Sequence, residues 1–90
     1  MEHGRFTFEM LKEILVDRVG VPEDEVLADP RATFESMGID SLGVTNLHVA
    51  VQQRYGFHIP DDAARRIRTV GRLIGWVNLR LTATRAKGAA

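Results

Sequence analysis

The stretch Gly38-Ile39-Asp40-Ser41-Leu42-Gly43 marks the boundary between a long irregular segment and the clearest helical pattern in the chain. Downstream of this stretch, apolar residues recur every three or four positions, which is the spacing of one face of an α-helix. These residues are Val44, Leu47, Val51 and Tyr55. The pattern predicts a helix over residues 41–55, about 22 Å long at 1.5 Å per residue, that begins at an Asp-Ser pair.

The other helices follow from the same periodicity. Helical patterns cover residues 6–19, 62–67 and 70–81, whereas residues 20–40 lack a sustained period and are interrupted by proline and glycine. No alternation typical of β-strands occurs. We therefore predict an all-α, four-helix bundle with three main helices, one short helix and a long first loop. The predicted core consists of Leu11, Leu15, Phe34, Val44, Leu47, Val51, Ile59, Ile67, Val70, Ile74 and Val77.

The size and composition of the chain exclude several classes of protein. Its 90 residues are enough for one domain, which we expect over residues 1–82, with residues 83–90 as a flexible tail. Because there is no cysteine, a disulfide, a thiolate zinc site, an iron–sulfur cluster and a cysteine nucleophile are all excluded. No apolar run approaches the roughly 20 residues of a membrane helix, and no signal-like segment is apparent, so we expect a cytoplasmic protein without membrane contact.

The balanced charge of the chain hides an asymmetry along it. Residues 1–62 contain all 12 acidic and five basic residues, a net charge of −7, whereas residues 63–90 contain seven basic residues and no acid, a net charge of +7. This basic third is either a solvated face or a surface that pairs with acidic groups of a partner enzyme, with Arg65, Arg66, Arg68 and Arg72 as its centre. Nucleic acid is not expected as a partner, because interleaved aromatic residues and a known reading motif are missing.

Ser41 admits two interpretations from its position alone. Asp40 or Ser41 can simply cap the helix, which is the commoner role of such residues. Alternatively, Ser41 is a site of covalent modification, because a phosphodiester at the first turn would meet free backbone N–H groups and the positive end of the helix dipole. Asp40 would then offer an acid to a modifying enzyme or its Mg²⁺, and Leu42 an apolar contact for a docking protein.

The segment Gly38-Ile39-Asp40-Ser41-Leu42 resembles the attachment motif of acyl carrier proteins. The likeness extends over about residues 6–80, because residues 55–62 and 67–70 match the family's second loop and its entry to the last helix. The resemblance implies a non-catalytic carrier whose Ser41 receives 4′-phosphopantetheine from a phosphopantetheinyl transferase, with Asp40 presenting the serine. The thiol of the arm would hold acyl groups as thioesters.

Within that family, residues 54–56 and 59–62 look most like carriers of type II aromatic polyketide synthases, which serve antibiotic biosynthesis. This likeness implies malonyl and growing polyketide chains as cargo. It also implies a malonyl transferase, a ketosynthase, and a ketoreductase or cyclase as partners of a monomeric carrier. Arg66 and Asn78 match polar positions of that subgroup and are candidate contacts to the chain; the alternative is an ordinary surface arginine and a helix asparagine.

The predicted second helix departs from the family in two ways. Carriers usually have acids along this helix that partner enzymes recognise, but here none follows Asp40. Gly43 also lowers helix stability by about 1 kcal/mol relative to alanine, for no reason visible in the sequence. We therefore assign partner docking to a set of exposed apolar and terminal acidic residues: Leu42, Thr45, Val49, Glu35, Asp61 and Asp62.

Other chemistries find no support in the sequence. His3, His48 and His58 lack metal-ligand spacing, so no metal site is predicted; His48 is interpreted as a residue on a helix face and His58 as a loop residue. No Gly-x-Ser-x-Gly pattern or glycine-rich phosphate loop occurs. Three hypotheses remain: a polyketide carrier, a carrier of fatty acyl or aminoacyl groups, and an unmodified carrier-like interaction subunit.

Overall fold

The computed structural model describes residues 5–89, and it describes side chains for residues 5–82. Within these residues it contains helices and short helical turns, no named strand, and one isolated β-bridge between Thr33 and Thr69. The predicted all-α class with four helices is confirmed. In chain order the elements are α1 (Phe8–Ile14), η1 (Leu15–Val19), η2 (Glu23–Glu25), η3 (Glu35–Met37), α2 (Ser41–Tyr55), α3 (Asp61–Arg66) and α4 (Val70–Ala89).

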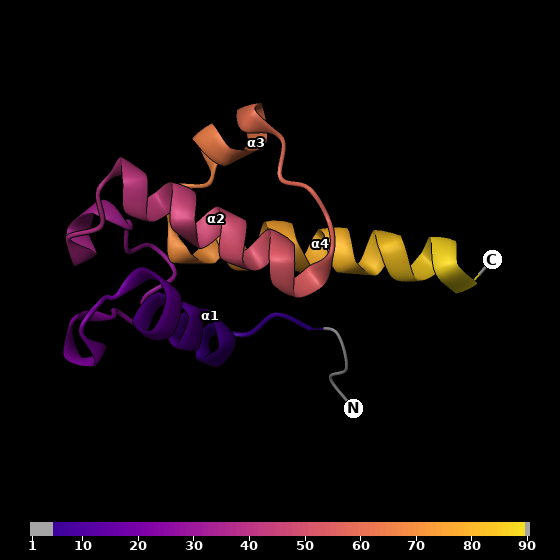
Figure 1. Cartoon of the computed structure of the whole chain (residues 1–90). Helices are drawn as coiled ribbons and strands as arrows, with labels where there is room; N and C mark the ends of the chain where they lie inside the picture. Colours follow the sequence, from indigo (N-terminus) through magenta and orange to yellow (C-terminus); the bar gives the residue numbers. More distant parts are fainter. Residues whose placement is uncertain (1–4, 90) are drawn as a thin grey trace.

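Three long elements lie side by side and the short α3 crosses one side of them (Figure 1). The chain runs along α1, turns through η2 and η3 at one end of the molecule, and returns along α2. Both α2 and α4 start at this end and run away from it. The loop that contains η2 and η3 therefore lies next to the N-termini of α2 and α4.

The core lies between α1, α2, α4 and the long first loop. Most of the predicted core residues are buried, and Val44 and Ile74 are half-buried. Further buried residues come from the loop, from the segment before α1 and from the helices themselves. They are Phe6, Ile14, Val21, Met37, Ile39, Ala50 and Leu73.

The first helix differs slightly from its predicted range. It begins at Phe8, because Thr7 is extended and its hydroxyl oxygen accepts a hydrogen bond from Met10 N at 3.3 Å. Its last turn, Leu15–Val19, is π-helical, and Gly20 ends it with a left-handed φ of 90°.

The last helix is longer than the sequence pattern predicts. We expected it to end near residue 81, where the apolar stripe stops, but α4 continues to Ala89. Residues 82–89 are mostly alanine, arginine, lysine and threonine without proline, so a helix already packed on the core can propagate through them. The flexibility of the segment from residue 83 onward stays a prediction.

The long first loop is tied to the start of α4. Phe34 N donates to Arg68 O at 3.2 Å, Val70 N donates to Ala32 O at 3.0 Å, and Gly71 N donates to Pro30 O at 2.8 Å. At Gly71 a Cβ atom would lie 2.9 Å from the Pro30 carbonyl oxygen, so only glycine allows this close approach. These contacts hold the loop in place up to the start of α2.

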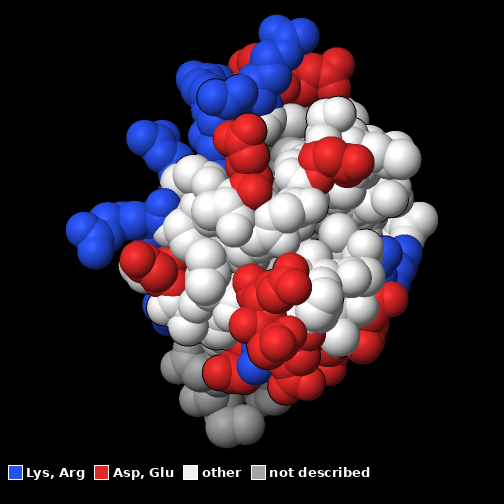
Figure 2. Space-filling model, turned by 90° about the vertical axis from the view of Figure 1, so that its left-hand side faces the viewer, with Lys and Arg blue, Asp and Glu red and all other residues white. Residues whose placement is uncertain are grey.

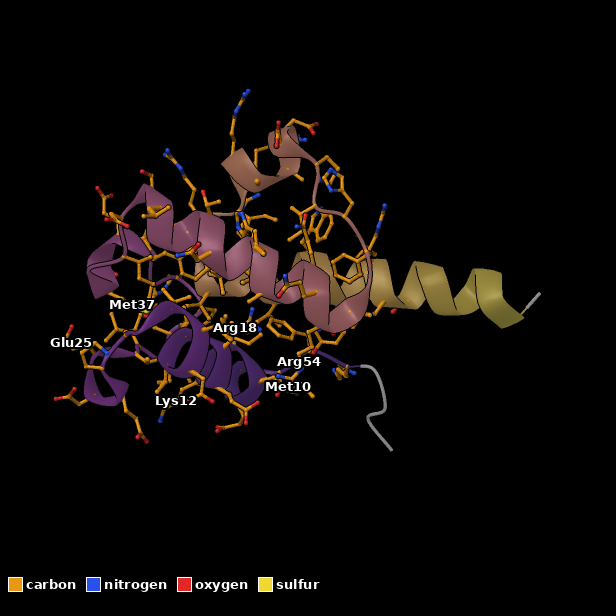
Figure 3. All side chains as sticks on the ribbon, in the orientation of Figure 1. Met10, Lys12, Arg18, Glu25, Met37 and Arg54 are labelled. Atoms are coloured by element: carbon orange, nitrogen blue, oxygen red, sulfur yellow. The ribbon has the colours of Figure 1, made fainter. Side chains whose placement is uncertain are left out.

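A second set of contacts joins α1 to α2. Arg54 Nη1 lies 3.1 Å from Glu13 Oε1, and Arg18 Nη2 donates to Gln53 Oε1 at 2.8 Å. Figure 3 shows Arg18 and Arg54 along the strip where the two helices face each other. These exposed pairs lie on the side of α2 that faces the first helix. The candidate site described below lies on a different side of α2.

Candidate functional site at the start of α2

The backbone around Ser41 is shaped by three consecutive features. Gly38 has a left-handed φ of 79°, Ile39 is buried in the core, and Asp40 is extended. Asp40 Oδ1 then accepts a hydrogen bond from Gly43 N at 2.8 Å, so Asp40 is the N-cap of α2. Ser41 is the first helical residue.

The Ser41 side chain does not contribute to the cap of the helix. The residue is exposed, and its hydroxyl makes no hydrogen bond within the part of the chain that the structure describes. The capping interpretation therefore applies to Asp40 and not to Ser41. An exposed, uncommitted hydroxyl at the first turn of a 15-residue helix suits an attached phosphate, because unpaired N–H groups and the positive end of the helix dipole lie beside it.

The structure supplies the reason for Gly43 that the sequence did not. A Cβ atom at this position would lie 2.6 Å from Ile39 Cγ2, well inside van der Waals contact, and 3.6 Å from Val19 Cγ1. Glycine therefore lets the first turn of α2 lie directly against the buried Ile39 side chain. The close approach fixes the backbone on both sides of Ser41.

Ser41 also lines an open groove between α2 and α3 with a volume of about 920 Å³. Two of its walls carry acids, Glu35 in η3 and Asp61 in α3. Arg65 and Arg68 line it as well, and both are exposed. The groove is therefore apolar at its base, where Phe34, Val44 and Ile67 contribute, and charged at its rim.

The predicted docking residues fall into two groups. Glu35, Thr45 and Asp61 line the groove together with Ser41, and the Thr45 hydroxyl donates to Ser41 O at 3.0 Å. Leu42 and Val49 are exposed apolar residues of α2, with 67% and 39% of their surface accessible. Asp62 is exposed on α3 but does not line the groove.

The two candidate chain-contacting residues lie outside the groove lining. Arg66 Nη2 is 3.2 Å from Asp62 Oδ2, one turn earlier on the exposed side of α3. Asn78 uses both ends of its amide on the backbone of Phe6, which gives it a structural role. Their contact with a bound chain stays a prediction.

His48 is the residue of this region that the sequence reasoning missed. We interpreted it as a helix-face residue, but it lines the groove and only 8% of its surface is accessible. Its Nε2 atom is buried without a hydrogen-bond partner among the described residues. Burial lowers the pKa of the His48 imidazole and so favours its neutral form. The sequence did contain a signal for this burial, because His48 lies four residues after Val44 and three before Val51, on the same face of the helix.

Charge is unevenly distributed on the end of the molecule where α2 and α4 start. Figure 2 shows most Lys and Arg along the upper and left edges of this face, with several Asp and Glu beside them, and a dense group of Asp and Glu in the lower half. Among the described residues, Arg65, Arg68 and Arg72 form no ion pair within 4.0 Å. The sequence asymmetry thus becomes a surface asymmetry.

The residues that the structure describes contain no cluster of three histidine, aspartate or glutamate side chains that would hold a metal ion. None of the helices in this part of the chain combines the length and the apolar character needed to cross a bilayer.

The sequence matches the model of one protein family, described as the phosphopantetheine attachment site, over residues 9–77. The chain belongs to this family. The matched range contains α2, the loop before it and the groove. Domains of the phosphopantetheine attachment family are the site of covalent 4′-phosphopantetheine attachment, and they are generally non-catalytic carriers that a phosphopantetheinyl transferase modifies. The chain is thus a carrier protein, and carrier domains generally interact with a phosphopantetheinyl transferase and with biosynthetic enzymes.

Proposed function

We propose that Ser41 is the attachment residue and that the arm on it carries malonyl units and a growing polyketide chain as thioesters. The observation that supports Ser41 is its exposed, uncommitted hydroxyl at the first turn of α2, next to the groove. Asp40 presents the serine by capping the helix. The transfer forms a bond between Ser41 Oγ and the phosphorus of the pantetheine phosphate and breaks the pyrophosphate bond of coenzyme A. The hydroxyl proton leaves to the transferase, and adenosine 3′,5′-bisphosphate is released.

The polyketide cargo is supported by the chemistry of the groove. A plain alkyl chain needs an apolar pocket, whereas this groove adds Asp61, Arg65, Arg68 and the imidazole of His48 to its apolar base. An oxygenated chain can pair with the buried His48 imidazole, which an alkyl chain would leave unpaired, and can reach the solvated charges at the rim. Fatty acyl and aminoacyl cargo are the alternatives that the loading experiment below separates.

Docking of the partner enzymes is proposed for the exposed residues around Ser41. Leu42 and Val49 supply apolar contact, and Glu35, Asp61 and Asp62 supply charge. A carrier must leave one enzyme and reach the next, so a small patch with weak binding suits the task. We propose a monomer in the cytoplasm that meets a malonyl transferase, a ketosynthase, and a ketoreductase or cyclase in turn.

The attachment is tested by intact mass after incubation with coenzyme A, Mg²⁺ and a broad-specificity phosphopantetheinyl transferase. The wild type should gain the mass of one phosphopantetheine group, and Ser41→Ala should gain none. Ser36→Ala is the matched control, because Ser36 is an exposed serine only five residues away. If Ser41→Ala is modified like the wild type, Ser41 is not the attachment residue.

The cargo is tested on the modified protein by offering three loading systems in parallel: a malonyl transferase with malonyl coenzyme A, an acyl-activating enzyme with a fatty acid, and an aminoacyl-activating enzyme. We expect efficient loading by the malonyl system. Efficient loading by either of the other systems alone would contradict the polyketide proposal and leave the attachment at Ser41 intact.

A further inference from the structure

The groove beside Ser41 contains one polar side chain that the fold does not explain. His48 projects from α2 two turns after Ser41, about 10 Å along the helix axis. It is more than nine-tenths buried, yet its Nε2 atom has no hydrogen-bond partner in the described part of the chain. Buried polar atoms are almost always paired in folded proteins, so an unpaired one inside a binding groove points to a ligand.

The surroundings of His48 explain why the fold leaves Nε2 unpaired. The charged groups that line the same groove are Glu35 and Asp40 before α2, Asp61 and Arg65 in α3, and Arg68 after it. None of them bonds to the imidazole: the Asp40 carboxylate is used at the helix cap, and the other four side chains are exposed at the rim. The neighbours of His48 on the stripe, Val44 and Val51, are apolar.

One wall of the groove, α3, has few buried contacts of its own. None of the side chains of α3 is fully buried, and it has only six residues. Segments with few buried side chains open locally at low free energy. A small outward movement of α3 would therefore widen the groove for a chain that enters it beside His48.

We propose that His48 is a specificity-determining residue that hydrogen-bonds a carbonyl or hydroxyl oxygen of the tethered cargo inside the groove. This inference rests on the proposed attachment at Ser41. A neutral imidazole with Nε2–H donates to a ketone oxygen, and the other tautomer accepts from a hydroxyl group. A saturated chain in the same place leaves Nε2 unpaired and lacks the stabilisation of this hydrogen bond. His48 thus favours oxygenated over alkyl chains of equal length.

The direct test uses the full-length protein with the arm attached, verified by mass, and with all histidines labelled with ¹⁵N. Two eight-carbon cargoes are compared, a saturated chain and its 3,5-dioxo counterpart, each joined through an amide in place of the thioester. We expect the dioxo cargo to shift the His48 Nε2 resonance and the saturated cargo to leave it in place. His58, an exposed loop residue outside the groove lining, is the internal control and should move with neither.

A second measurement gives the size of the effect. The dioxo cargo should raise the folding equilibrium constant of the wild type about two- to tenfold more than the saturated cargo does, as expected for one net hydrogen bond. His48→Leu should abolish this difference, and His48→Gln, which keeps a donor and an acceptor, should retain part of it.

The outcomes separate the two proposals. If no arm is attached to the wild type, the proposed function fails, and the inference that rests on it fails with it. If the arm is attached but both cargoes leave His48 unchanged, or shift it equally, the inference is wrong. A shift already complete in the cargo-free protein with its arm would assign His48 to the arm itself and would also overturn the role in cargo selection.

Discussion

Phe6 and Asn78 form a reciprocal pair of hydrogen bonds across 72 residues of sequence. Phe6 N donates to Asn78 Oδ1 at 2.6 Å, and Asn78 Nδ2 donates to Phe6 O at 2.8 Å. Phe6 itself is fully buried, and its ring makes an edge contact with Tyr55. One amide side chain of α4 therefore holds the N-terminal segment against the bundle.

Removal of this amide should destabilise the protein without any cargo present. We expect Asn78→Ala to lower the free energy of unfolding by about 1–3 kcal/mol, because it leaves a partly buried N–H and C=O of Phe6 unpaired. Urea denaturation of the unmodified protein measures the change. Asn46→Ala, at an exposed position of α2, is the control and should stay within about 0.5 kcal/mol. An Asn78→Ala variant as stable as the wild type would refute the structural role.

Gly43 and Gly75 should respond in opposite ways to the same substitution. Gly75→Ala meets nothing within 4 Å, so alanine should stabilise α4 by about 0.5–1 kcal/mol through helix propensity. Gly43→Ala places a methyl group 2.6 Å from the branched Ile39 side chain, which is buried and has little room to move. The overlap should outweigh the propensity gain and destabilise the protein by about 1–2 kcal/mol. Thermal unfolding of both variants decides; a stabilised Gly43→Ala would contradict the close packing.

Asp40 supplies both a hydrogen-bond acceptor for the helix cap and a negative charge, and substitutions can separate these two properties. Asp40→Ala removes the acceptor for Gly43 N and should lower stability by about 1 kcal/mol, whereas Asp40→Asn keeps an acceptor and should stay near the wild type. If the carboxylate also serves the transferase, Asp40→Asn should be modified several-fold more slowly while remaining stable. Equal loss of stability in both variants would show that the cap does not operate.

Leu42 offers a test of the docking surface. Leu42→Asp should leave the unfolding free energy within about 0.5 kcal/mol, because the side chain is 67% exposed. It should lower kcat/KM of the transferase about tenfold, since apolar contact next to Ser41 is lost. Leu79→Asp is the matched control, because Leu79 is 72% exposed on α4. A similar rate loss in both variants would argue against a specific role for Leu42.

The burial of His48 should make stability depend on pH. Burial lowers the pKa of its imidazole in the folded state, so below about pH 6.5 the unfolded chain binds a proton that the folded protein does not. The free energy of unfolding should therefore fall as the pH decreases from about 6.5 toward the lowered pKa of the folded state. Above pH 7 His48 should not make the free energy of unfolding depend on pH. His48→Gln should flatten this part of the profile. The nearby charges, Glu35, Asp40, Asp61, Arg65 and Arg68, remain in both proteins. An identical slope in wild type and variant would contradict the burial.

Most of the fold could be predicted because the helical spacing of the apolar residues and the positions of glycine and proline indicate the same helix boundaries. The stripe from Val44 to Tyr55 marked α2, and Gly56 ended it with a φ of 76°, as a C-terminal glycine does. Contacts between distant segments left no such pattern. The apolar residues Met37 and Ile39 indicate that the long loop packs on a core, but no local period shows that the loop folds back onto the start of α4.

The candidate site likewise combines features that local sequence patterns predict with features that depend on contacts between distant segments. The proposed attachment region could be located from the sequence alone, because the motif around Ser41 is local and contiguous. The reason for Gly43 depends on the Ile39 side chain being turned inward, and His48 shares its groove with residues of α3 and of the long first loop. Likewise, Asn78 meets Phe6 only because α4 runs beside the N-terminal segment. These relationships are tertiary, and periodicity along one helix does not encode the partner on another.

Localisation of the arm within the modified protein tests the central claim most directly. After modification, the protein is digested and the peptide that contains both Ser36 and Ser41 is fragmented in the mass spectrometer. The account predicts that every fragment carrying phosphopantetheine includes Ser41 and that fragments ending before it are unmodified. Phosphopantetheine on Ser36, on a threonine or on any other residue would contradict the account.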